Sequence, residues 1–339
     1  MRKGGADARA WQLLDVLADG EFHSGEVLAN RLGVSRASIF NALSGIADYG
    51  VALQRVRGRG YRLNRPWQRL DHREIEYWLG DGAAQFRLEI LPQAGSSNAL
   101  LLQRAINEGA PSASVLAVEL QTAGRGRMGR AWHSGLGSAL TFSLLWRFDC
   151  GLNGLSGLSL AVGVAIARVL DEIGAQDVRL KWPNDVLAGQ GKMGGVLIEA
   201  QGDMLGPSAV VIGVGLNCTL PDRLARQIGQ PASALDEVCP AMPARNRLLA
   251  ALLLELAHVL RQFAQGGFAP FRDEWEQYHA YQDKQIGLHM PDGSTVNGLA
   301  RGVGDNGELC LETAQGVRRF NSGEVIGQVK RKAGDEAAD

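Results

Sequence analysis

The stretch from Glu119 to Ser134, ELQTAGRGRMGRAWHS, concentrates residue types that bind anions. Three glycines alternate there with three arginines: Gly124, Arg125, Gly126, Arg127, Gly129 and Arg130. Glycine permits φ > 0, and a guanidinium group can bind a carboxylate or a phosphate in a forked geometry. The pattern therefore predicts a loop that holds an anion, with a solvated surface loop as the alternative.

The glycine spacing also matches G-x-G-x-x-G, the pattern of dinucleotide-binding turns. In such turns small residues lie between the glycines and a helix begins within the motif, whereas here arginines fill those positions and RAWHSG follows Gly129. We expect no helix N-terminus to receive a phosphate at this loop. The arginine charges must bind the anion instead.

A second polar group surrounds the turn Lys181-Trp182-Pro183-Asn184-Asp185, and Lys192 follows it ahead of a short strand. Lysine supplies a point charge for phosphate and a carboxylate suits Mg²⁺, so this turn is a candidate phosphate and metal site. Asp185 alone is also an ordinary turn residue. Two further groups could bind a polar ligand, and each also has a purely structural explanation. Ser96, Ser97 and Asn98 could cap a helix, and Asn217 could end a strand.

Length and composition indicate the kind of protein that carries these motifs. A chain of 339 residues suits two or three domains, and a net charge of −1 argues against a surface that coats nucleic acid or membrane throughout. The four cysteines form no C-x-x-C pair, which predicts neither a zinc site nor a disulfide framework. With no apolar signal core at the N-terminus, we expect a soluble cytoplasmic protein without a membrane span.

The first 65 residues predict a DNA-binding unit. Apolar residues recur at helical spacing in three short segments, and Gly33 separates the second from the third, which begins at Ser35. VALQRVRGRGYRL then alternates as a strand hairpin, and Asp48 is the only acidic residue between Arg31 and Arg65. This order of two helices joined by a glycine turn, followed by a basic hairpin, is typical of domains that insert a helix into a DNA groove. The alternative is that the segment is a protein-interaction domain. The linker is expected at residues 64–67.

The rest of the chain predicts the elements that position the polar motifs. Strands are expected at 87–91, 115–119, 139–146, 178–180, 196–199 and 209–214, with apolar helices after Asn98 and over 155–173. Further helices follow at 250–263 and 270–278. Beyond residue 281, short strands alternate with Pro-Asp-Gly and Asp-Asn-Gly turns, which predicts a small β-barrel, and the tail from 331 is expected to be disordered.

Three of these motifs together resemble one family: AGRGRMGRAW at 123–132, KWPND at 181–185 and KMGGVLIE at 192–199. With the winged helix in front, the chain is similar to the bifunctional biotin-protein ligases and biotin operon repressors of bacteria. The resemblance implies an α/β (α+β) catalytic domain with a central mixed sheet, preceded by a winged helix-turn-helix and followed by a small SH3-like β-barrel. The domains are then expected at 1–65, 68–280 and 281–330, with the tail at 331–339.

The resemblance also implies roles for single residues, with Lys192 and Arg127 as the catalytic pair. Biotin would be bound by Ser96, Ser97, Asn98, Gln121, Gly124, Arg125, Gly126, Arg127 and Lys192. ATP and the adenylate would be bound by Arg127, Arg130, Trp132, Lys181, Asn184 and Asn217, with Asp185 holding Mg²⁺. DNA would be contacted by Ser35, Arg36, Ser38, Asn41, Arg55, Arg57 and Arg59.

The implied activity is a two-step ligation in which ATP activates biotin as biotinyl-5'-AMP and a lysine of a biotin carboxyl carrier protein then receives it. The adenylate-bound protein would dimerise and repress biotin synthesis genes at a palindromic operator. Two rival hypotheses are a transcription factor whose inactive ligase-like domain only senses biotin, and a ligase with a vestigial DNA domain. Departures from the family pattern fall at Gly95, where aspartate is expected, at Asn41 and Ala42, where basic or histidine side chains are usual, and at Met128.

Overall fold

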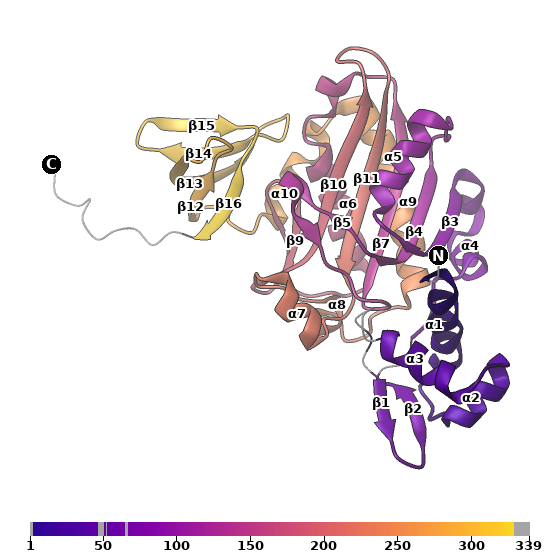
Figure 1. The fold of residues 1–339 in the computed structure, drawn as a ribbon. Coiled ribbons are helices and arrows are strands. Elements are labelled where there is room, and N and C mark those ends of the chain that lie inside the picture. Colours follow the sequence, from indigo (N-terminus) through magenta and orange to yellow (C-terminus); the bar gives the residue numbers. More distant parts are fainter. Residues whose placement is uncertain (1–2, 47–50, 52, 65–66, 329–339) are drawn as a thin grey trace, which may run out of the picture.

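The computed structural model describes residues 3–46, 51, 53–64 and 67–328, and places them in three successive parts (Figure 1). The N-terminal part packs helices against a two-stranded hairpin, the central part is built on a seven-stranded sheet, and the C-terminal part is a five-stranded antiparallel sheet. Residues 331–339, for which disorder was predicted, lie outside the described residues.

The N-terminal part has the helix-turn-helix order expected from the sequence. Its elements are α1 (Lys3–Leu17), α2 (Gly25–Leu32), α3 (Arg36–Ile46), β1 (Leu53–Val56) and β2 (Gly60–Leu63). The Ser24 side chain caps α2, and Gly33 ends it with φ 64°, a left-handed conformation that glycine adopts without strain. Leu28, Ile39 and Leu43 are buried between the helices, which fixes the angle at which α3 is presented.

The joint between the first two parts is packed. Trp67, expected in the linker, is buried, with its ring centroid 6.1 Å from that of Trp11, and it shares a cluster with Leu120 and Leu136 of the central part. Burying the large apolar surface of a tryptophan side chain is favourable, which stabilises the packed joint. Arg65 and Pro66 lie outside the described residues.

The central sheet has the strand order β3-β4-β7-β11-β10-β9-β8, and only β3 and β4 are parallel, so the sheet is mixed as expected. Helix α5 connects these two strands, because parallel neighbours need a crossover. The strands are β3 (Arg87–Ala94), β4 (Ser114–Gln121), β7 (Ala139–Phe148), β8 (Val178–Lys181), β9 (Asp185–Ala188), β10 (Gly191–Gly202) and β11 (Ser208–Asn217). The helices are α4 (His72–Leu79), α5 (Ser97–Asn107), α6 (Leu158–Glu172), α7 (Asp222–Ile228), α8 (Leu235–Val238), α9 (Arg245–Gly266) and α10 (Arg272–Tyr278).

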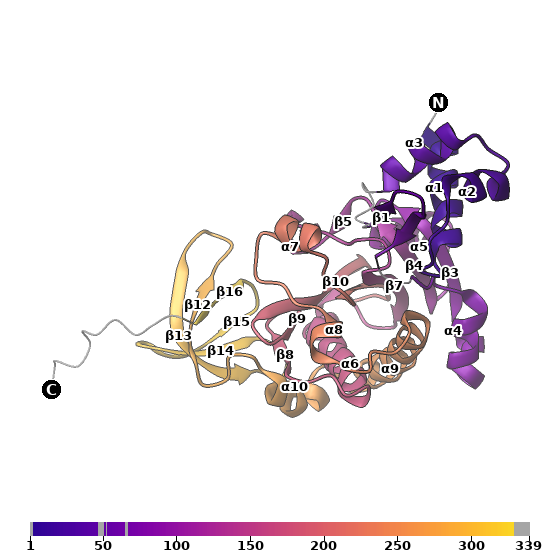
Figure 2. The same cartoon turned by 90° about the horizontal axis from the view of Figure 1, so that it is seen from below.

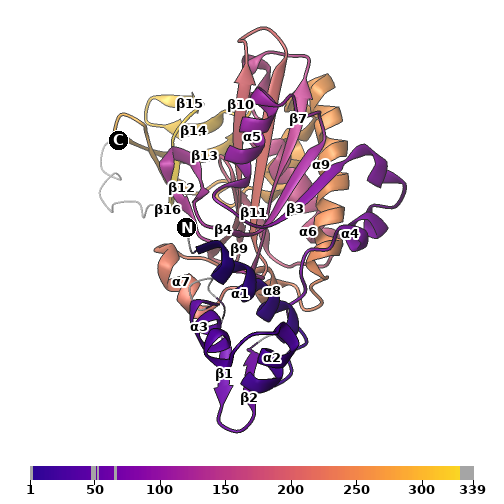
Figure 3. The same ribbon diagram turned by 45° about the vertical axis from the view of Figure 1, so that its right-hand side comes forward.

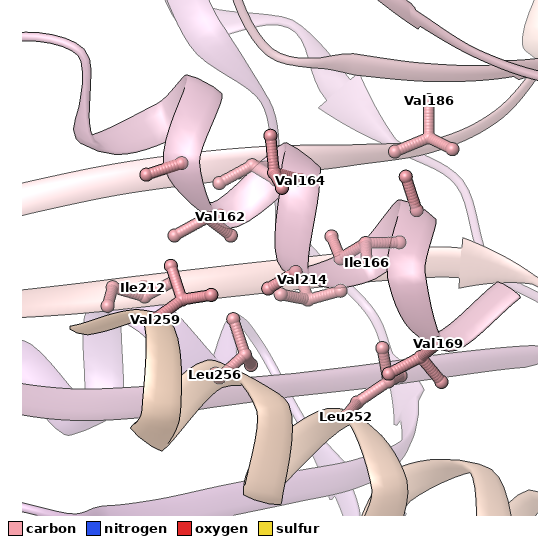
Figure 4. Close-up of a cluster of buried hydrophobic side chains, with 14 of the residues drawn as sticks. Val162, Val164, Ile166, Val169, Val186, Ile212, Val214, Leu252, Leu256 and Val259 are labelled. Atoms are coloured by element: carbon pink, nitrogen blue, oxygen red, sulfur yellow. The ribbon is translucent and has the colours of Figure 1, made fainter. Parts of the chain in front are cut away.

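Alternate residues of the strands build two separate cores, one on each face of this sheet. On β11, Ile212 and Val214 point toward the large core with α6 and α9, whereas Val211 belongs to the smaller core under α5. Figure 4 shows Val162 and Ile166 of α6 and Leu256 of α9 gathered around these strand residues. Figure 2 shows α6 and α9 side by side on one side of the sheet.

Two helical segments are long and apolar enough for a membrane span by length and composition alone, 152–172 and 245–266. They contain α6 and α9, whose apolar side chains form the large core. A core helix passes the same test, so this property is weak grounds for a membrane span.

The C-terminal part continues from α10 through the predicted turns. Its strands, in the order β15-β14-β13-β12-β16, are β12 (Gln285–His289), β13 (Thr295–Val303), β14 (Leu309–Thr313), β15 (Gly316–Phe320) and β16 (Glu324–Gln328). Trp182 Nε1, in the turn before β9, donates a hydrogen bond of 2.9 Å to the carbonyl oxygen of Gly307, which joins the C-terminal part to the central part. At the start of β16, Glu324 forms an ion pair with Arg130 of the central part.

Candidate functional site

One cavity brings together residues that are far apart in the chain. It lies at the ends of β10 and β11, beside the N-terminus of α5 and under residues 124–132, here called the Gly/Arg loop. The predicted residues that line it are Ser96, Ser97, Asn98, Gln121, Arg125, Gly126, Arg127, Arg130, Trp132, Lys181, Asn184, Asp185, Lys192 and Asn217. Gly124 is not among the lining residues; its backbone pairs with Trp132, and a Cβ there would lie 2.5 Å from the carbonyl oxygen of Trp132.

The deep end of the cavity is a network of buried neutral polar groups. Ser96 caps α5 by accepting from the N–H of Ala99, so the serine-as-cap alternative holds for this residue. Gln121 Oε1 accepts from the backbone N–H of Ser97 at 2.8 Å, which ties the end of β4 to the start of α5. Asn98 Oδ1 accepts from the hydroxyl of Ser143, a residue with no exposed surface. Such a network presents fixed donors and acceptors to a polar, uncharged ligand group.

The Gly/Arg loop folds over this end as a small hairpin. Its two strands, β5 (Gly124–Arg125) and β6 (Ala131–Trp132), are two residues long each and are joined through the short 3-10 turn η3 (Arg127–Gly129). The expectation that its glycines supply positive φ is met only in part. Gly129 has φ 73°, Gly126 has φ −116°, and Met128 takes φ 55°. Since a non-glycine residue rarely adopts this region, the loop holds local strain at Met128, which is 66% exposed.

The three arginines of the loop differ in their partners. Arg125 donates to Glu199 at 2.7 Å, and Arg130 forms a two-pronged ion pair with Glu324 of β16. Arg127 donates a hydrogen bond to Asn184 Oδ1 at 3.4 Å, which is long for a hydrogen bond. Burial lowers the pKa of Arg127, and a guanidinium remains charged despite such a shift. Arg127 thus presents a desolvated positive charge whose bond to protein is weak.

Two lysines enter the cavity from opposite sides of the turn. Lys192 Nζ lies 2.5 Å from Asp185 Oδ1, and both side chains are less than a quarter exposed. Burial lowers the pKa of Lys181, while Asp185 and Glu324 nearby partly offset that effect. The side chain of Asn184 donates to the carbonyl of Val196 at 2.7 Å, which holds the turn against β10. Cations held at low exposure are suited to a polyanionic ligand.

The indole of Trp132 closes one wall of the cavity. Gly215 lies directly against it, since a Cβ on Gly215 would be 2.5 Å from Trp132 Cε2. At the same wall Asn217 is buried, and its amide donates to the carbonyl of Ser233 at 3.1 Å. Among the residues that the structure describes, neither Asn217 Oδ1 nor Trp132 Nε1 has a hydrogen-bond partner. A flat ring beside a free acceptor suits a planar heterocycle with an amino group.

The predicted metal ligand Asp185 is engaged in the ion pair with Lys192. Within residues 3–46, 51, 53–64 and 67–328, no three His, Cys, Asp or Glu side chains gather as a metal cluster. Mg²⁺ is commonly held by one or two carboxylates together with substrate phosphates, so a single carboxylate in a cationic cavity fits a metal that arrives with its phosphates.

Five of the predicted DNA-contacting residues have exposed side chains: Arg36, Asn41, Arg55, Arg57 and Arg59. Two others act locally instead: Ser35 Oγ accepts from the N–H of Ser38 at 3.1 Å, and the two hydroxyls lie 3.0 Å apart, so both belong to the cap of α3.

Three residues of the cavity and its shell had no predicted role. Ser143 reads in the sequence as one more residue of a buried strand, and Glu324 lies about two hundred residues from its partner Arg130. Glu199 closes the KMGGVLIE motif, and its carboxylate binds both Arg125 and Asn98. The position of Glu199 in the motif was the only signal that could have singled out one of these residues.

Comparison with known proteins agrees with this architecture. Residues 92–217 match the biotin/lipoate A/B protein ligase family, residues 9–62 an HTH domain, and residues 283–326 the biotin protein ligase C-terminal domain. The chain is 37% identical to the bifunctional ligase/repressor BirA of Salmonella typhimurium over 92% of this chain and 95% of the relative. It is 33% identical to the biotin–[acetyl-CoA-carboxylase] ligase of Mycobacterium tuberculosis over 78% and 97%.

Among solved structures, the fold resembles that of the biotin protein ligase from Aquifex aeolicus in complex with biotin and ATP. The TM-score is 0.60 at 26% identity, and the match covers 72% of this chain and 99% of that one.

Proposed function

The chain belongs to the family of bifunctional biotin-protein ligases and biotin operon repressors, and from this premise we propose how its own residues carry out each activity. It is an ATP-dependent biotin ligase with a DNA-binding repressor domain. We propose that the acceptor is a lysine of a biotin carboxyl carrier protein, since the name of the Mycobacterium tuberculosis relative gives acetyl-CoA carboxylase as that ligase's substrate.

The observation that carries the assignment is the set of environments that one cavity brings together. Neutral polar groups around Gln121 and Asn98 line it, and so do the cations Arg127 and Lys192. The indole of Trp132 and the unpaired Oδ1 of Asn217 are also in its wall. These three environments suit a ligand with a polar ring, a carboxylate to be activated, and an adenosine group.

In the first step a carboxylate oxygen of biotin attacks the α-phosphorus of ATP, and the bond from that phosphorus to the β-phosphate oxygen breaks, so pyrophosphate leaves. Two negatively charged reactants must approach, which makes charge neutralisation and positioning the main demands. Arg127 and Lys192 neutralise the carboxylate and α-phosphate, while Arg130, Lys181 and Asn184 contact the phosphates that leave. When bound, Mg²⁺ neutralises phosphate charge, and Asp185 would hold it.

In the second step the neutral amine of the carrier lysine attacks the acyl carbon, the bond to the phosphate oxygen breaks, and AMP leaves while the amide nitrogen loses a proton. Water would attack the same carbon, so the intermediate needs cover. The hairpin of the Gly/Arg loop supplies it, with Arg125 anchored to Glu199.

The repressor activity uses the N-terminal part. We propose that the adenylate-bound protein forms a homodimer in the cytoplasm and places two α3 helices on a palindromic operator. The domains are assigned to 1–65, 68–280 and 281–330. The basic residues Arg36, Arg55, Arg57 and Arg59 supply the phosphate contacts, because Asp48 is the only acidic residue between Arg31 and Arg65.

Biotin-dependent exchange of labelled pyrophosphate into ATP tests the first step alone. Wild-type protein is expected to exchange label only with biotin and Mg²⁺ present. Absence of exchange, with a known ligase active under the same conditions, would overturn the enzymatic assignment and favour an inactive biotin sensor.

A further inference from the structure

The exposed face of α3 carries an aromatic side chain that the proposed function leaves unused. Ile39, Leu43 and Ile46 point into the core, and Phe40 points away from it with 49% of its surface exposed. Burying the exposed part of a phenylalanine side chain is favourable, so a residue left in water on a binding helix is available for an apolar contact.

The surroundings of Phe40 are basic and polar. The guanidinium carbon of Arg55, on β1, lies 5.5 Å from the centroid of the Phe40 ring and 5.6 Å from that of Tyr61. Arg36 is exposed one turn before Phe40, and Asn41 is exposed next to it. Figures 1 and 3 show α3 beside the hairpin β1-β2 at the end of the molecule away from the central sheet.

A polyanion is the occupant that such a surface favours, and DNA also offers an apolar group within its major groove. Each thymine presents its C5 methyl there, and each adenine presents the N7 acceptor and N6 donor that an asparagine side chain can bind together. A protein partner with an acidic surface would pair with the arginine charges, but it would not explain why Phe40 and Asn41 are exposed side by side.

We propose that α3 reads an A·T-containing half-site directly, with Phe40 against a thymine methyl and Asn41 on an adenine. Arg55 stacks on Phe40 and holds the ring toward the groove, while its charge faces the phosphates. This inference rests on the repressor part of the proposed function and names what its recognition helix binds.

The test begins with selection from a pool of random duplex DNA by the full-length protein in the presence of biotin and MgATP. The enriched half-sites are expected to contain A·T pairs. In the selected duplex each thymine is then replaced by deoxyuridine, which removes only the C5 methyl. Wild-type affinity should fall at one thymine by about fourfold per half-site, the worth of one buried carbon.

Variants connect that loss to Phe40. Phe40→Ala should bind the thymine and deoxyuridine duplexes equally, Phe40→Leu should keep part of the difference, and Val27→Ala, an exposed apolar residue on α2, should behave like wild type. Asn41→Ala should bind duplexes containing adenine and 7-deazaadenine, which lacks the N7 acceptor, with equal affinity. All four variants should biotinylate a carrier domain normally, which shows that the central part is folded, and should give the wild-type far-ultraviolet circular dichroism spectrum, which shows that the helices of the N-terminal part are retained.

Two results would overturn the inference: wild-type binding insensitive to deoxyuridine at every thymine, or an undiminished effect in Phe40→Ala. Failure to enrich any sequence while carrier biotinylation is intact would instead remove the repressor function, and the inference with it, and leave a ligase with a vestigial DNA domain.

Discussion

The buried ion pair between Glu119 and Arg245 gives the sharpest test of how the parts are held together. The two side chains are 1% and 7% exposed, and Arg245 Nη2 lies 2.8 Å from Glu119 Oε2. Glu119 also accepts from the N–H of Leu70, and Arg245 also donates to the carbonyls of Gln68 and Ala139. One network thus ties β4, two residues before Gln121, to the segment that follows the N-terminal part.

Glu119→Gln keeps the size of the side chain and an acceptor for Leu70 but leaves the Arg245 charge without its counter-charge. Removing one partner of a buried pair costs about 3–5 kcal/mol, and the two carbonyls that still accept from Arg245 favour about 3 kcal/mol. For a unit of this size that loss lowers Tm by roughly 6–12 °C. Thermal unfolding followed by circular dichroism measures it.

Asp177→Asn is the matched control in the same part of the chain. Its pair with Arg179 is about half exposed at 3.3 Å, and such pairs contribute about 0–1 kcal/mol. The double variant Glu119→Leu with Arg245→Met should recover part of the loss, since no unpaired charge stays buried, although the N–H of Leu70 loses its acceptor. A Glu119→Gln variant no less stable than Asp177→Asn would refute the reasoning.

Three further predictions concern the site and its surroundings. Lys192→Ala should reduce adenylate formation by about 10²–10³-fold, the usual effect of losing one preorganised charge donor, and pyrophosphate exchange within threefold of wild type would contradict the role assigned to Lys192. Gly215→Ala should displace the Trp132 indole, because the new Cβ would lie 2.5 Å from it; a weakened adenylate in a filter-binding assay is expected, and unchanged affinity would argue against that wall as the adenine site. Burial lowers the pKa of His279 from 6.5 to about 4. Between these pH values His279 binds a proton in the unfolded chain but not in the folded chain. The free energy of unfolding should therefore fall by about 3 kcal/mol as the pH drops from 6.5 to 4. His279→Gln should lessen that fall in urea titrations, and an unaltered pH profile would exclude His279 as its cause.

The elements that sequence patterns could predict are those with local causes. Gly33 ends α2 because a left-handed residue is needed there, and β13 spans Thr295–Val303 as expected because Pro-Asp-Gly and Asp-Asn-Gly turns enclose it. The arginines and lysines of the cavity could be found because their residue types occur in short, specific motifs. All of the family-implied cavity residues except Gly124 line one pocket.

What sequence patterns could not predict depends on contacts between distant segments. Glu324 meets Arg130 only because the C-terminal part docks beside the loop, and Ser143 becomes a hydrogen-bond donor only because α5 crosses over β7. Trp67 is buried because two parts close around it. Met128 takes the positive φ expected of a glycine because the ends of the loop are fixed by pairing between β5 and β6.

Transfer of biotin to a carrier protein is the activity on which the other assignments depend, and mass spectrometry measures it directly. Full-length protein, biotin, MgATP and a biotin carrier domain are incubated, with the Lys192→Ala variant as the matched control. With wild-type protein the carrier is expected to gain the mass of one biotinyl group, and with the variant it should gain that mass far more slowly. A carrier that gains no mass with wild-type protein, while a known ligase modifies it, would show that the protein is not a biotin ligase.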